Sequence, residues 1–262
     1  MKALASVSVS LVALLVTVMI LLPVEGGQAL VISAPASMTE VLTSLKPEAE
    51  RYIGLPLQLN FGASGALRSH IEHGARVDVY ISAAANHMDR LERSGFLASG
   101  TRRNLLSNNL ALIGDGSHAK PESLADLRGL LASVDRIAIG DPDVVPAGSY
   151  AIEALRGLGV SGLEGDRLIL GGSVRQVLSF VESGSAPLGI VFVSDTKSAR
   201  KPATSRVEIL HVFPPDAFPT PVVYPAAVIT TSLWQTEGVL LIDFFKSSDA
   251  RDSFIAAGFG IP

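Results

Sequence analysis

The sequence predicts an α/β fold, in which helices flank largely parallel sheets, and three observations support this. Short runs rich in β-branched residues alternate with helical patterns along most of the 262 residues. Several of these runs, such as LVISA and LGIVFV, are continuously apolar, which is typical of strands buried on both faces. Hydrophobic residues make up 48% of the chain, which is enough for one large domain or two small ones.

The expected elements follow one another in order along the chain. Apolar runs bounded by turn residues predict strands over 29–34, 57–61, 77–82, 110–114, 136–140, 167–170, 188–193, 207–213 and 222–230. Apolar positions at helical spacing predict helices over 38–52, 67–73, 88–94, 150–158 and 174–183. Two segments, 107–109 and the proline-rich 213–225, are the candidates for crossings between two lobes.

Residues 1–29 are expected to form a signal peptide. Lys2 precedes an apolar run over 11–22, and the small residues of 26–29 offer a cleavage site. The run is short for a membrane span, although an uncleaved N-terminal anchor is the alternative. We therefore expect a mature chain that starts near Leu30, outside the cytoplasm.

The overall composition excludes several classes of protein. The formal net charge is −4, so no basic surface indicates nucleic-acid binding. The chain has no cysteine, which excludes disulfides, thiolate catalysis, cysteine-ligated zinc and a lipid anchor on an N-terminal cysteine.

Four predicted strands are followed by turns built from Ser, Ala, Gly and Pro. These turns are PASMTE at 35–40, GASGA at 62–66, GDPDVVPAGSY at 140–150 and GGSVRQ at 171–176. Helix capping can explain each turn alone. Ser37 with Glu40, and Ser173 with Gln176, match the capping box, and Pro146 suits the first turn of a helix.

The four turns together indicate a site for an anion. A helix N-terminus presents unpaired N–H groups and a partial positive charge, and small residues let an anion approach them. In open α/β sheets, ligands bind beyond the carboxyl ends of the strands, where all four turns are expected. Four such ends could bind an oxyanion without lysine or arginine.

Five segments carry a resemblance to a known family. In order, they are ISAPASMTEVL, FGASGALRSHIEHGARVDVYISA, GDPDVVPAGSYAIEAL, GGSVRQVL and APLGIVFVSDT. They resemble the periplasmic molybdate-binding proteins of bacterial ABC transporters, from about Leu30 to Pro262. The resemblance implies a type II periplasmic-binding-protein fold of two α/β lobes with the ligand in the cleft between them. It places lobe I at 30–108 plus 226–262 and lobe II at 109–225.

The resemblance also implies which residues contact the anion. Ser37 and Ser64 match serines whose hydroxyls face the oxyanion, and Ala147 and Val174 match residues that donate backbone N–H groups. Phe192 occupies a position where many family members have a tyrosine whose hydroxyl contacts the anion. A phenylalanine cannot donate this hydrogen bond.

The function implied is the capture of molybdate or tungstate in the periplasm and its delivery to permease subunits in the inner membrane. The resemblance implies a binding protein without enzymatic activity or a cofactor, in which molybdenum enters only as the bound oxyanion with no direct protein ligand. We expect a monomer. Because the proposed groups are mainly donors, hydrogen phosphate, which needs an acceptor, should be rejected. Sulfate could be excluded only by the size of the cavity.

Three alternatives remain open at this stage. The chain could bind another oxyanion, such as sulfate, in the same fold. A serine hydrolase is the second alternative, because GASGA approximates the G-x-S-x-G motif and Ser64, Asp141 and His211 follow in hydrolase order. His211, however, lies in an apolar strand pattern. His70 and His73 have the spacing of a metal-binding pair, but no third ligand is in register.

Overall fold

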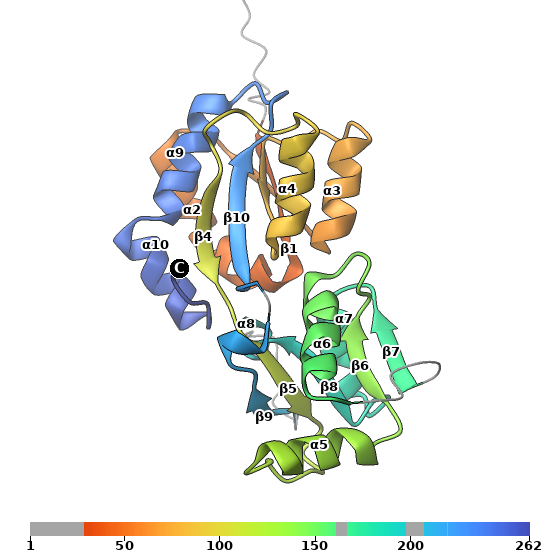
Figure 1. Ribbon diagram of the computed structural model, residues 1–262. Helices are drawn as coiled ribbons and strands as arrows, with labels where there is room; N and C mark the ends of the chain where they lie inside the picture. Colours follow the sequence, from red (N-terminus) through yellow and green to blue (C-terminus); the bar gives the residue numbers. More distant parts are fainter. Residues whose placement is uncertain (1–28, 161–166, 198–206, 219) are drawn as a thin grey trace, which may run out of the picture.

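The computed structural model describes residues 29–160, 167–197, 207–218 and 220–262. The predicted signal peptide lies outside the described residues except for Ala29. Within the described ranges the strands form two five-stranded sheets, which occupy the upper and lower halves of Figure 1 with helices around each. Helices flank both sheets, which confirms the predicted α/β class. In the same ranges, no helix has the length and apolar character needed to cross a bilayer.

The first sheet has the strand order β2-β1-β3-β10-β4. Its strands are β1 (Leu30–Pro35), β2 (Leu57–Gly62), β3 (Val79–Ile81), β4 (Arg103–Ser107) and β10 (Val223–Val228). The helices drawn around it in the upper half of Figure 1 are α2 (Thr39–Ile53), α3 (Ser64–Glu72), α4 (Ala85–Arg93), α9 (Gln235–Phe245) and α10 (Ser248–Ala256). A short 3-10 helix, η1 (Ala36–Met38), connects β1 to α2.

The second sheet has the strand order β7-β6-β8-β5-β9. Its strands are β5 (Leu110–Gly114), β6 (Ile137–Gly140), β7 (Leu168–Gly171), β8 (Leu188–Phe192) and β9 (Glu208–Val212). The helices of this half are α5 (Leu124–Ser133), α6 (Pro146–Gly157), α7 (Val174–Glu182) and α8 (Val193–Thr196), with a 3-10 turn, η3 (Pro215–Ala217), before β10.

Each sheet is mixed, and the described strands pair in the same way in both. In the first sheet, β1 pairs in parallel with β2 and β3, whereas β10 runs antiparallel to β3 and β4. In the second sheet, β6 pairs in parallel with β7 and β8, whereas β5 runs antiparallel to β8 and β9. Parallel pairing is therefore confined to the half of each sheet that carries the four small-residue turns.

Within the part of the chain that the structure describes, two crossings connect the sheets. The first crossing follows β4 at Asn108, and the second connects β9 to β10. We propose that the two sheets mark the two lobes expected from the sequence, 30–108 plus 226–262 and 109–225. On this proposal the second boundary is better placed just before Val223, because β10 belongs to the first sheet.

Candidate functional site

A small cavity lies where the two halves of the molecule meet. All four small-residue turns contribute to its wall, and the lining residues are Pro35, Ala36, Ser37, Gly62, Ala63, Ser64, Ala83, Val145, Pro146, Ser173, Val174 and Phe192. The free volume is about 10 Å³, room for about one water molecule. A larger ligand would therefore require the residues that line the cavity to shift. No carboxylate, lysine or arginine is among these lining residues.

Ser37 lies in η1, directly after β1, and its side chain is buried. Its hydroxyl lies 3.2 Å from the Tyr224 hydroxyl. The sequence predicts a capping box between Ser37 and Glu40, and this is wrong. Neither η1 nor α2 has a side-chain cap, since their N-cap positions are Pro35 and Met38, and the Ser37 hydroxyl makes the tertiary contact instead. The burial of this serine is therefore not explained by helix capping.

Ser64 is the first residue of α3 and is fully buried. Its Oγ accepts a hydrogen bond of 3.0 Å from the backbone N–H of Ala83, in the loop after β3. The Tyr80 hydroxyl donates to the Ser64 carbonyl oxygen over 2.7 Å. Since a backbone N–H can only donate, the proton of the Ser64 hydroxyl remains available for a partner in the cavity.

The turn before α6 begins the helix at Pro146, as predicted, with Val145 at the N-cap. Ala147 follows in the first turn, where N–H groups have no partner within the helix. It is fully buried, but its neighbours Val145 and Pro146, rather than Ala147 itself, line the cavity. The Asp141 carboxylate accepts from the N–H of Asp143 and so belongs to its own loop.

The turn before α7 is a capped helix start. The Ser173 hydroxyl accepts from the N–H of Gln176, which confirms the predicted serine cap. The Gln176 side chain reaches the N–H of Gly172 over 2.7 Å instead of that of Ser173. Val174 is the first helical residue and lines the cavity, so the unpaired end of α7 faces the same space as Ser37 and Ser64.

Phe192 ends β8, is almost fully buried and lines the cavity. Its ring packs edge-on against that of Tyr224, with the ring centroids 5.8 Å apart. Sequence reasoning did not place Tyr224 at the site. No local pattern could do so, because this tyrosine reaches Ser37 from β10, on the far side of the second crossing.

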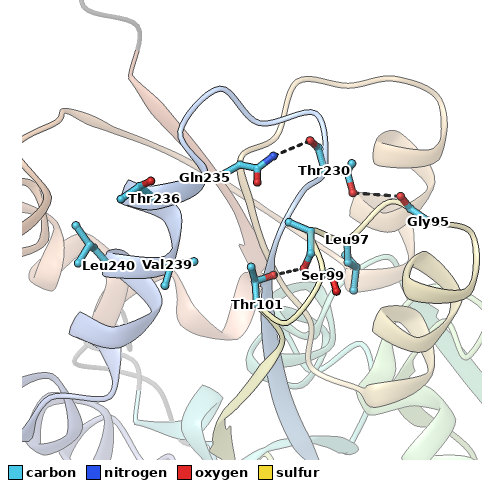
Figure 2. Close-up of a pocket in the computed structure, with 10 residues that line it drawn as sticks. Gly95, Leu97, Ser99, Thr101, Thr230, Gln235, Thr236, Val239 and Leu240 are labelled. Atoms are coloured by element: carbon cyan, nitrogen blue, oxygen red, sulfur yellow. Dashed lines mark hydrogen bonds between the residues drawn. The ribbon is translucent and has the colours of Figure 1, made fainter.

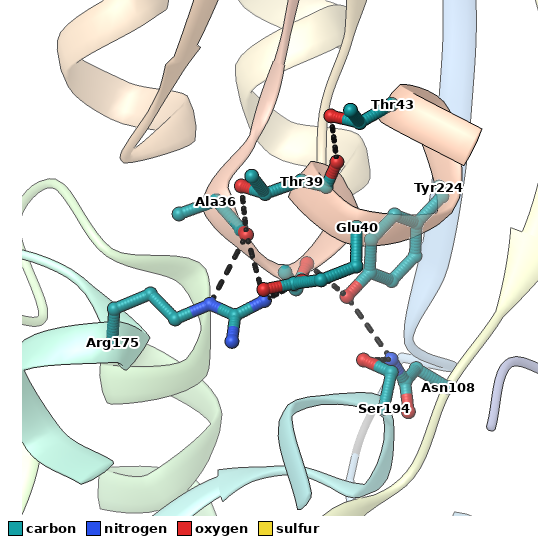
Figure 3. A network of polar contacts seen from close by, with 9 residues as sticks. Ala36, Thr39, Glu40, Thr43, Asn108, Arg175, Ser194 and Tyr224 are labelled. Atoms are coloured by element: carbon teal, nitrogen blue, oxygen red, sulfur yellow. Dashed lines mark hydrogen bonds and ion pairs between the residues drawn. The ribbon is translucent and has the colours of Figure 1, made fainter. Parts of the chain in front are cut away.

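Direct contacts join the two halves beside the cavity. The N–H of Gly65, at the start of α3, donates to the carbonyl oxygen of Val144 over 2.9 Å. Arg175 of α7 forms an ion pair with Glu40 of α2 and donates to the carbonyl oxygen of Ala36 (Figure 3). The Glu40 carboxylate is therefore engaged by a cation, and Glu40 is not among the residues that line the cavity. Neither contact was expected from the sequence.

Asp195 is a buried carboxyl close to this region. Its Oδ2 accepts from the N–H of Phe192 over 3.0 Å, and its Oδ1 has no hydrogen-bond partner among the described residues. Burial raises the pKa of Asp195 to about 7, and the charge of Arg175 opposes this increase in part. The protonated carboxyl is thus stable in the folded protein at pH values where an exposed aspartate is ionised.

We expect Asp195→Asn to stabilise the protein at neutral and alkaline pH. The unfolded chain releases this proton near the ordinary pKa of 3.8, whereas the folded protein releases it near 7. The free energy of unfolding of the wild type should therefore fall as the pH rises through this window. The variant should lack this fall and be more stable by up to a few kcal/mol at about pH 8, with little difference at about pH 4.

Thermal or urea unfolding at both pH values measures this effect. Asp252→Asn, an exposed aspartate in α10, is the matched control and should change little at either pH. A stability difference for Asp195→Asn that is independent of pH would contradict the assignment.

The described structure gives no support to the catalytic or metal-binding alternatives. The Ser64 hydroxyl is bonded to a backbone N–H, while His211 lies on β9 and packs against Phe213. Within the described ranges, no group of three or more His, Cys, Asp or Glu side chains could hold a metal ion.

A larger hollow of about 800 Å³ lies between the start of α9 and the loop after α4 (Figure 2). Three of its polar side chains already bond backbone carbonyls, since Gln235 donates to Thr230, Thr230 to Gly95 and Thr101 to Ala98. It has no charged lining residue, and the four turns do not reach it. The small cavity is therefore the candidate site.

Comparison with known proteins places this arrangement in a family. A model described as bacterial extracellular solute-binding protein matches residues 30–260. The chain is 31% identical over 237 residues to a putative ABC transporter substrate-binding lipoprotein of Bacillus subtilis, covering 90% of this chain and 87% of that protein. It is 32% identical to the molybdate-binding protein ModA of Escherichia coli, covering 87% of each.

A solved structure shows the same fold. The substrate-binding domain of a putative molybdenum ABC transporter from Clostridium difficile superposes with a TM-score of 0.68 and 31% identity, covering 89% of this chain and 99% of that one. Together with the two mixed sheets, this similarity confirms the predicted two-lobed fold.

Proposed function

Because the chain belongs to the bacterial extracellular solute-binding proteins, we propose that it captures molybdate, or tungstate, and delivers it to the permease of an ABC transporter. It is a binding protein and not an enzyme. The oxyanion is its cargo and not a cofactor, and molybdenum is enclosed by its own oxygens without a direct protein ligand.

One observation carries this proposal: four strand-to-helix turns from both halves converge on a single cavity. We assign Ser37 and Ser64 as hydroxyl donors, and Ala147 and Val174 as backbone N–H donors. The N-termini of the helices that follow these turns add partial positive charge next to the cavity. Donors of this kind can neutralise a dianion in a protein whose net charge is −4.

The lining chemistry favours a fully deprotonated anion. Hydrogen phosphate carries a proton and needs an acceptor, usually a carboxylate, but none lines the cavity. Two carboxylates close in sequence to the lining residues have other partners, since Glu40 pairs with Arg175 and Asp141 accepts from the N–H of Asp143. Sulfate offers the same donor-accepting surface as molybdate, so only the size of the cavity can separate them.

The place of action follows from the family. The chain is extracytoplasmic, and we propose the periplasm as its compartment, with residues 1–29 as the export signal. We further propose that it acts as a monomer and meets its permease at the inner membrane. A single chain contains both walls of the cavity, so a second copy is not needed to complete the site.

A thermal-shift screen tests the proposed ligand. Molybdate at a hundred times its dissociation constant should add about 2.7 kcal/mol of stability, and tungstate a similar amount. Phosphate should add none, because its proton would face donors. Equal stabilisation by phosphate would contradict the selectivity, and no response to either metal oxyanion would contradict the proposed function.

Ser64→Ala separates a ligand contact from a structural role. Loss of one donor to a buried charge should cost about 1.5–3 kcal/mol of binding free energy, or roughly 10- to 150-fold in the dissociation constant. Calorimetric titration with molybdate measures this change. Ser69→Ala, further along the same helix, is the matched control, because the Ser69 hydroxyl lies 3.5 Å from Nδ1 of His73, and it should bind as the wild type does. If both variants bound alike, Ser64 would not be a ligand-binding residue.

A further inference from the structure

We infer that Asn108 and Tyr224 are positioning residues that orient the Ser37 hydroxyl as an obligatory donor into the cavity, and thereby discriminate against anions that carry a proton. This inference deepens the proposed function and rests on it. The three side chains form a continuous chain of hydrogen bonds, part of which is visible in Figure 3.

The chain begins at Asn108, which is buried at the first crossing between the sheets. Its Oδ1 accepts from the N–H of Asn109 over 2.9 Å, and this fixes the orientation of the amide. Its Nδ2 therefore donates, to the Tyr224 hydroxyl over 3.1 Å and to the Ser194 hydroxyl over 2.9 Å. Asn108 thus presents only a donor to Tyr224.

Tyr224 in turn determines which hydroxyl donates in its hydrogen bond with Ser37. Its oxygen accepts from Asn108, and its own proton needs an acceptor, because an unpaired buried hydroxyl is costly. The Ser37 Oγ, 3.2 Å away, is the partner that the structure provides. Burial raises the pKa of Tyr224 far above its ordinary value, so the hydroxyl keeps its proton throughout the working pH range. Edge contacts with Phe192 and Phe259 hold the ring in place.

The Ser37 hydroxyl therefore keeps its own proton, and this proton is directed into the cavity that Ser37 lines. If Ser37 accepted a hydrogen bond from the anion instead, its own O–H would need another acceptor, and the Tyr224 oxygen already accepts from Asn108. Ser64 is held in the same way by the N–H of Ala83. Both serines therefore present protons, which suits an anion without one and disfavours hydrogen phosphate.

Asn108→Asp tests this directionality by replacing the donor with an acceptor. Tyr224 should then donate to the new carboxylate, and Ser37 should donate to Tyr224 and turn a lone pair towards the cavity. At mildly alkaline pH, molybdate and hydrogen phosphate are both dianions, so the added charge repels them equally. We expect the preference for molybdate over hydrogen phosphate, measured by competition in calorimetric titration, to fall by about tenfold.

Asn109→Asp is the matched control, since it adds the same charge one residue away without touching the Tyr224 hydroxyl. It should weaken both anions and leave their ratio unchanged. The double variant Asn108→Asp with Tyr224→Phe should also lose the effect on the ratio, because the relay is interrupted. A ratio that shifts equally in Asn108→Asp and Asn109→Asp, or that shifts without Tyr224, would overturn the inference.

Tyr224→Phe alone provides a second test if Asn108→Asp does not fold. It keeps the ring between Phe192 and Phe259 and removes only the hydroxyl. We expect about tenfold weaker molybdate binding, since the Ser37 proton is no longer directed into the cavity. Wild-type affinity in this variant would contradict the inference. Absence of molybdate binding by the wild type would instead contradict the proposed function, so the two failures are distinguishable.

Discussion

Gly65→Ala should weaken molybdate binding by about 10- to 100-fold, because it prevents a close backbone contact between the two halves of the molecule. A Cβ at Gly65 would lie 2.8 Å from both the Cα and the carbonyl oxygen of Val144, in the other half of the molecule. Because both neighbours are backbone atoms of the other half, the two halves could not approach as closely, and the N–H bond from Gly65 to Val144 would be lost.

Alanine is otherwise the better helix former, by roughly 0.5–1 kcal/mol, so a loss of affinity would not come from weaker helix formation in α3. Gly129→Ala in α5 is the matched control, because its Cβ would meet no atom within 4 Å. Calorimetric titration and thermal unfolding of both variants decide the question. Unchanged molybdate affinity in Gly65→Ala would show that close approach at Val144 is not needed for binding.

Gly148→Ala should destabilise the fold itself, by about 3 kcal/mol or more. A Cβ at this position would lie 1.9 Å from the carbonyl oxygen of Gly140 and 3.1 Å from the backbone nitrogen of Pro142. The clash is between backbone segments that side-chain movement cannot separate. The melting temperature should fall by roughly 6–12 °C in a domain of this size, and molybdate binding should weaken as the first turn of α6 shifts.

A control for Gly148→Ala is present in the same helix. Gly157, the last residue of α6, has open space where a Cβ would be added. Gly157→Ala should therefore leave the melting temperature close to that of the wild type or raise it slightly. A similar, small effect in both variants would contradict the tight packing of this turn against the end of β6.

The parts of the fold that could be predicted are those with strong local signals. The continuously apolar strands β1, β5, β6 and β8 lie within one residue of their expected bounds. Pro146 starts α6 and Ser173 caps α7, because both signals act within a single turn of helix. Helix α5 was not predicted, although the sequence contains a start signal for it. This signal is Ser123, which caps the helix by accepting a hydrogen bond from the N–H of Asp126.

Other elements depend on contacts that are distant in sequence. Strand β4 has two exposed residues at its start and exists through its pairing with β10. Helix α9 begins at Gln235 after the N-cap residue Trp234, which supplies no side-chain cap, and its apolar run LLIDFF does not distinguish helix from strand.

The candidate site likewise has residues that the sequence predicts and residues that it does not. The turns that carry Ser37, Ser64, Ala147 and Val174 stand out in the sequence, because small residues directly follow predicted strands. The groups that orient these four residues do not stand out in the sequence. Tyr224, Asn108 and the ion pair between Arg175 and Glu40 come together only when the two sheets pack, and no spacing rule links residues so far apart.

The position of β10 inside the first sheet has a consequence for how the chain folds as it is made. The second sheet is built from one continuous stretch, 110–212, and can form as soon as that stretch has emerged. The first sheet can be completed only later, because β10 lies between β3 and β4, and α9 packs on α2. Until Val223–Val228 arrives, the newly made half exposes an open strand edge, which is prone to wrong pairing. The last part of the chain to be synthesised thus decides whether the first part can fold.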